Sequence, residues 1–126
     1  MAKIRIAQSP TFKALVHIPI VGCEPEAIEF TFKYRDRPAL AALFDEWNLK
    51  TKEMREGFGE STTLSEVVSA ETEYQVQQIK DLVAGWAFDD KFDEKSITAL
   101  VKSCQGATEA VVDAYQGAYN QARLGN

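Results

Sequence analysis

Two stretches of alternating apolar residues constrain the fold of this chain more than any other feature of its sequence. In residues 12–21 the apolar side chains fall at every second position: Phe12, Ala14, Val16, Ile18 and Ile20. Residues 27–35 repeat this spacing: Ile28, Phe30, Phe32 and Tyr34. Such alternation is typical of strands with one buried face, and Gly22 and Pro25 mark a turn between them. We therefore expect an antiparallel hairpin over about residues 12–35.

A hairpin alone is only marginally stable in water, so its apolar face has to pack on helices or join further strands. Residues 3–8 also alternate and are the candidate for a third strand. Pro19 has no N–H to donate to a neighbouring strand, so the first strand is expected to lie at a sheet edge, or to bulge, near this residue.

Helix starts follow the hairpin. Asp36 before Pro38, Thr63 with Glu66, and Asp93 each have the position of an N-terminal cap. The apolar spacing after these caps, with Gly106 as a break, predicts helices over about residues 38–56, 64–84, 94–104 and 107–123. The polar segment 69–75 is a candidate break in the second helix. The apolar face expected for this helix is Leu64, Val67, Val68, Ile79, Leu82, Val83 and Trp86.

The predicted fold class is therefore α+β. It is mostly α-helical, with an N-terminal antiparallel hairpin of two or three strands packed on about four helices. The 126 residues are expected to form a single domain over residues 1–126, since a chain of this length holds one hydrophobic core but not two comfortable ones.

The net charge of −5 is unevenly distributed along the chain. Residues 1–37 have a balance of +2, and residues 38–126 a balance of −7. Nucleic-acid binding requires an excess of cations, so we expect no nucleic acid as a partner; an acidic surface would instead suit a basic protein. No apolar run approaches the length that spans a bilayer and no signal peptide is recognisable, so we expect no membrane association and a cytoplasmic location.

The sequence contains no recognisable catalytic or metal-binding pattern. His17 has no acidic partner near it in sequence, and Cys23 and Cys104 lie far apart, so zinc-ligand spacing is absent. The densest acidic cluster, over residues 89–94, lacks the calcium-loop pattern and suits a helix cap with a solvated turn. We expect no cofactor, no metal and no enzymatic activity, and we keep metal binding by this turn as an alternative.

The last third of the chain resembles the tail assembly chaperones of long-tailed bacteriophages. The resemblance rests on an aromatic and acidic turn, a small junction, a tyrosine-bearing helix and a closing Ala-Arg and Asn. The matching positions are Trp86, Phe88, Asp89, Asp90, Phe92, Gly106, Ala107, Tyr115, Ala122, Arg123 and Asn126. The segment 32–37, at the end of the hairpin and before a helix, is also similar to the family.

The resemblance implies a non-enzymatic protein that binds the tape measure protein and keeps it soluble while the tail tube assembles. It also implies self-association into a homo-oligomer, contact with the tail tube protein as a second partner, and a place in the host cytoplasm but not in the mature virion. Two alternatives stay open. One is a small metal-binding enzyme, or enzyme subunit, that uses the acidic turn 89–94. The other is a generic cytoplasmic adaptor. Trp86 and Phe88 fit either the core or a partner contact.

Overall fold

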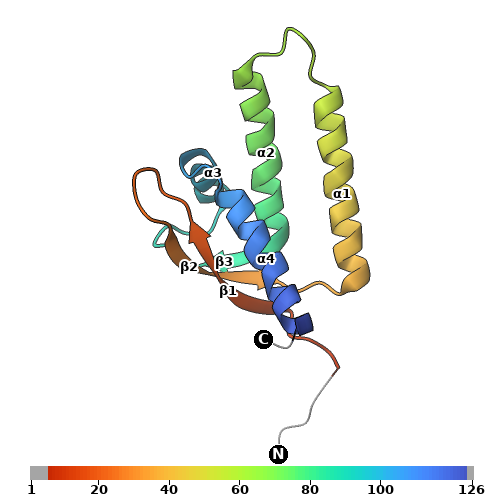
Figure 1. Cartoon of the computed structure of the whole chain (residues 1–126), viewed down its shortest axis with the longest axis vertical. Coiled ribbons are helices and arrows are strands. Elements are labelled where there is room, and N and C mark those ends of the chain that lie inside the picture. Colours follow the sequence, from red (N-terminus) through yellow and green to blue (C-terminus); the bar gives the residue numbers. More distant parts are fainter. Residues whose placement is uncertain (1–5, 125–126) are drawn as a thin grey trace, which may run out of the picture.

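The computed structural model describes residues 6–124, and within this range the chain forms three strands and four helices (Figure 1). In chain order they are β1 (Thr11–Ile18), β2 (Glu26–Lys33), α1 (Arg37–Glu56), α2 (Leu64–Leu82), β3 (Val83–Trp86), α3 (Glu94–Ser103) and α4 (Ala107–Leu124). The predicted α+β class, mostly helical with an N-terminal antiparallel hairpin, is confirmed. Apart from the end of α2, the helix bounds differ from the prediction by at most one residue.

The sheet has the order β1-β2-β3, and both pairings are antiparallel. In the hairpin, Phe12 lies opposite Phe32 and Val16 opposite Ile28, so the even-numbered side chains of both strands share one face. This face is buried under the helices and the other is exposed, as the alternation predicted. β1 forms an edge of the sheet and ends at Ile18, directly before Pro19.

The third strand does not come from residues 3–8. Residues 6–8 are not part of a strand, and residues 3–5 lie outside the described residues. Instead β3 follows α2 directly, with Phe32 opposite Val83 and Phe30 opposite Trp86. The helix predicted over 64–84 accordingly ends at Leu82. A four-residue segment shows too little periodicity to distinguish a strand from the end of a helix. Residues 83–86 form a strand because they pair with the free edge of β2.

The helix caps predicted from sequence are present. The Asp36 carboxylate accepts from the Ala39 N–H at 3.0 Å, and Asp93 accepts from the Ser96 N–H at 2.9 Å. Thr63 and Glu66 form the complete capping box at the start of α2. Local hydrogen bonds of this kind involve only neighbouring residues, which is why they were predictable without the tertiary structure.

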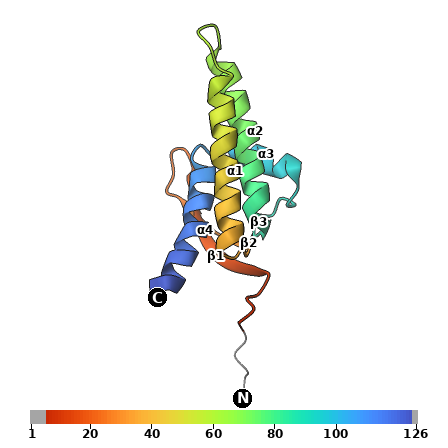
Figure 2. The ribbon, with the colours of Figure 1, turned by 90° about the vertical axis from the view of Figure 1, so that its right-hand side faces the viewer.

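α1 and α2 form a long antiparallel pair that projects beyond the sheet, as two views at right angles show (Figures 1 and 2). α2 is continuous through residues 69–75, so the predicted break is wrong. The two helices are joined through Trp47, whose Nε1–H donates to Asp81 Oδ2 at 2.9 Å. The Tyr74 hydroxyl donates to the Trp47 carbonyl oxygen at 3.2 Å.

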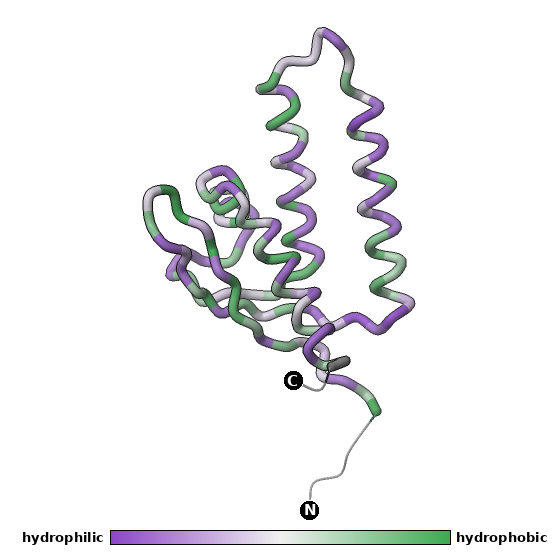
Figure 3. Tube along the Cα trace, viewed as in Figure 1, coloured by the Kyte–Doolittle hydropathy of each residue, from purple (hydrophilic) through white to green (hydrophobic). Residues whose placement is uncertain are grey.

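The hydrophobic core lies between the inner face of the sheet and helices α2, α3 and α4. Its fully buried side chains include Val16, Ile18, Phe30, Phe32, Ile79, Leu82, Val83, Val111 and Tyr115. Coloured by hydropathy, the chain is hydrophobic along much of the strands, whereas hydrophilic residues repeatedly interrupt the projecting helices (Figure 3). The projecting part of α1 and α2 is therefore stabilised by fewer buried side chains than the rest.

Candidate functional site

The aromatic residues of the turn after β3 pack on one another and on the sheet. The ring centroids of Trp86 lie 5.0 Å from those of Phe88 and 4.9 Å from those of Phe92, both edge to face. The ring centroid of Phe30 lies 5.8 Å from that of Trp86 and 5.9 Å from that of Phe88. Trp86 Nε1–H also donates to the Asp90 carbonyl oxygen at 2.8 Å. The three turn aromatics are half-buried, so their main contacts are with the core.

The acidic residues of the same turn are spread over the surface. Asp89 and Asp90 are exposed, while Asp93 caps α3, and its hydrogen bond from the Ser96 N–H is the main cause that lowers the pKa of its carboxyl. Among residues 6–124, no group of three or more His, Cys, Asp or Glu side chains is arranged to hold a metal ion. The turn thus offers capping and solvation but no ligand set.

Gly106 and Ala107 make the junction between α3 and α4. Gly106 has a φ of +91°, in the left-handed region that favours glycine, and a Cβ built there would lie 3.4 Å from Pro19 Cγ. Ala107 is buried. The junction therefore needs glycine for its backbone conformation and a small side chain where α4 begins.

Tyr115 and Tyr119 of α4 hold the chain segment that leaves β2. The Tyr115 hydroxyl donates to the Lys33 carbonyl oxygen at 2.8 Å. The Tyr119 hydroxyl accepts from the Arg35 N–H at 2.9 Å and donates to the Arg35 carbonyl oxygen at 3.0 Å. Burial is the main cause that raises the pKa of the Tyr115 phenol above its ordinary value. Tyr115 is one of the positions that match the family pattern, whereas Tyr119 is not. The i, i+4 spacing of the two tyrosines was the sequence feature that placed Tyr119 on the same face of the helix.

The remaining positions of the family pattern lie at the end of the chain. Ala122 is exposed and Arg123 belongs to the last turn of α4, while Asn126 lies outside the described residues. Trp86, Phe88 and Phe92 gather in one cluster, and Tyr115 joins the core near Phe32. The structure does not assemble the whole set into one site, and a role of these positions in partner binding stays a prediction.

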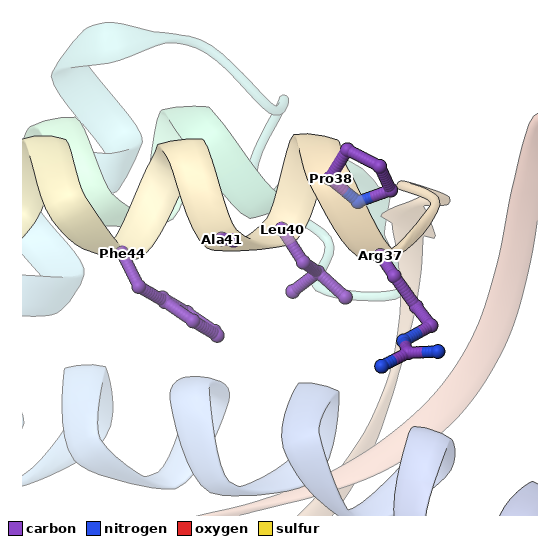
Figure 4. A pocket seen from close by; sticks show the side chains of 5 residues that line it. All are labelled: Arg37, Pro38, Leu40, Ala41 and Phe44. Carbon is purple, nitrogen blue, oxygen red and sulfur yellow. The ribbon is translucent and has the colours of Figure 1, made fainter.

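An apolar hollow lies along the first turns of α1, on its side facing α4. Arg37, Pro38, Leu40, Ala41 and Phe44 line a volume of about 680 Å³. The side chains of Leu40 and Phe44 point across the gap toward α4 (Figure 4). Both are half-buried and belong to the margin of the core, so this hollow marks where α1 is only partly packed.

A larger groove of about 1230 Å³ runs along α2, α3 and the start of α4. Its lining mixes apolar and charged side chains: Leu64, Val68, Val76 and Val101 with Glu71, Glu73, Lys80, Glu94, Lys102 and Glu109, among others. Sequence reasoning assigned Leu64 and Val68 to the packed apolar face of α2, but they are 78% and 52% exposed. The reason is that the first turns of α2 project beyond the sheet (Figure 1). Helical periodicity predicts that these residues share one face of the helix, but it does not predict whether another element buries that face.

The described residues 6–124 form an α+β fold with a groove along α2, α3 and the start of α4. The chain belongs to a phage tail assembly chaperone family, whose model matches residues 1–126. No curated protein and no solved structure matches the chain significantly. None of the helices in the described part of the chain combines the length and the apolar character needed to cross a membrane.

Proposed function

We propose that this protein is a non-enzymatic chaperone that binds the tape measure protein and keeps it soluble while the tail tube assembles. Membership of the tail assembly chaperone family supports this proposal. The protein acts in the host cytoplasm, self-associates, contacts the tail tube protein as a second partner and is absent from the mature virion.

The observation that carries the proposal is the exposed apolar stripe on the first turns of α2. Leu64 and Val68 lie one turn apart on this helix and are 78% and 52% exposed. Large apolar side chains at helical spacing on a surface groove are what a protein needs to shield the apolar face of an amphipathic helix from water. Among the described residues, no feature supports a catalytic function in the way that this apolar stripe supports a chaperone.

Co-expression with the tape measure protein of the same phage tests the proposal. We expect the tape measure protein to stay in the soluble fraction and to co-purify with this chain, and to become insoluble when it is expressed alone. A tape measure protein that remains insoluble and does not co-purify would refute the proposed function. Mass spectrometry of purified virions tests the expected absence from the mature particle, and light scattering tests self-association.

A further inference from the structure

We propose that the groove along α2 binds a basic amphipathic helix of the partner protein, with Leu64 and Val68 as its apolar contacts. This inference rests on the proposed function and adds to it the binding face and the chemistry of the bound segment.

The two apolar contacts belong to a row of residues along one side of α2. Leu64, Val68, Thr72 and Val76 follow one another at a spacing of four residues, and all four line the groove. The row spans about 18 Å along the axis of α2. Its inner end is closed, because Val76 is only 8% exposed, while Val101 of α3 is 9% exposed. The outer end is open at Leu64 and Val68.

The size of the groove favours a polypeptide over a small ligand. Sites for small molecules are mostly apolar cavities of about 300–1,000 Å³ with few polar groups. This groove is larger, at about 1230 Å³, and charged side chains stand along its length. A helix laid into it can bury its apolar stripe on the α2 row while its polar face stays in water.

The charges of the lining indicate the sign of the partner. Four glutamates and two lysines line the groove. Lys80 already forms an ion pair with Glu94, so the remaining charged residues of the lining are Glu71, Glu73, Glu109 and Lys102, three negative charges against one positive. A bound helix whose apolar stripe is flanked by Lys or Arg would complement this excess of negative charge, whereas an acidic helix would be repelled. The occupant we assign is therefore a basic amphipathic segment of the tape measure protein.

Co-expression of full-length variants with the tape measure protein tests this assignment. Val68→Glu places a charge in the apolar row, and we expect the amount of soluble, co-purified partner to fall about tenfold or more. Leu49→Glu is the matched control, because Leu49 is 56% exposed on α1 and does not line the groove. We expect it to retain the partner. If Val68→Glu does not fold by circular dichroism, Leu64→Glu replaces it, since Leu64 is 78% exposed.

A double charge reversal tests the electrostatic part. Glu71→Lys with Glu73→Lys should reduce capture of the partner. The control Glu53→Lys with Glu56→Lys makes the same change in charge on α1, outside the groove, and should not reduce capture.

Capture that survives both Val68→Glu and the groove reversal would overturn the inference and leave the proposed function intact. Failure of the wild-type chain to capture the partner would refute both. A change in oligomeric state with capture retained would show that the groove holds a second copy, which also overturns the inference.

Discussion

The hydroxyl of Tyr119 binds both backbone groups of Arg35, accepting from its N–H at 2.9 Å and donating to its carbonyl oxygen at 3.0 Å. The two residues are 84 positions apart, so one side chain of α4 fixes the segment between β2 and α1. The Tyr115 hydroxyl, 3.1 Å from that of Tyr119, binds the Lys33 carbonyl oxygen in the same segment. These contacts set where α1 leaves the sheet.

Replacing Tyr119 by Phe should destabilise the fold by about 1–3 kcal/mol, because both backbone groups of Arg35 lose a partner in a half-buried site. Urea unfolding monitored by circular dichroism measures the change. Tyr34→Phe is the control: Tyr34 stacks on Tyr119, but within the described residues its hydroxyl forms no hydrogen bond. Equal losses for the two variants would contradict the role given to the Tyr119 hydroxyl.

The Trp47→Phe substitution should loosen α1 from α2. It keeps an aromatic ring but removes the Nε1–H that donates to the Asp81 carboxylate, a hydrogen bond to a charged group worth about 1.5–3 kcal/mol. Amide hydrogen exchange should become faster in α1 than in α4, since α4 packs on the sheet independently of this contact. If α1 and α4 lost amide protection equally, this would contradict the view that the Trp47–Asp81 hydrogen bond stabilises α1 locally against α2.

Two glycines should respond with opposite signs to substitution by alanine. Gly106→Ala forces a side chain onto a φ of +91° beside Pro19, and we expect a loss of about 1–2 kcal/mol. Gly117→Ala lies within α4 where a Cβ meets nothing within 4 Å, and should stabilise the protein by about 0.5–1 kcal/mol. Denaturant unfolding of both variants checks the pair, and a gain in stability for Gly106→Ala would disprove the account of the junction.

The cap at Asp93 should make stability depend on pH in the acid range. The hydrogen bond from the Ser96 N–H is the main cause that lowers the pKa of the Asp93 carboxyl below 3.8. A lowered folded-state pKa gives stability that is present above the ordinary value and lost as pH falls through the lowered one. Asp93→Asn keeps an N-cap acceptor that does not titrate. The difference in melting temperature between wild type and this variant should therefore become smaller as the pH falls below 3.8. A difference that does not change with pH would contradict the stabilising role of the ionised Asp93 cap.

The candidate groove shows how far sequence alone could reach. Helical spacing placed Leu64 and Val68 on one face of α2, but the same spacing is expected for a buried stripe. Exposure depends on how far α2 extends past α3 and α4, which is a property of chain segments distant in sequence. Glu71 and Glu109 come from different helices, so their shared groove could not be recognised before these helices were placed.

Local patterns determined the hairpin, its buried face, the helix class and the three N-terminal caps, since each depends on residues a few positions apart, such as Asp36 and Ala39. Tertiary structure alone decided the rest. The strand after α2 forms because β2 offers it an unpaired edge, and Tyr119 reaches Arg35 because α4 folds back across the sheet. Such contacts are stabilised by partners distant in sequence, and no local spacing encodes which segments will meet.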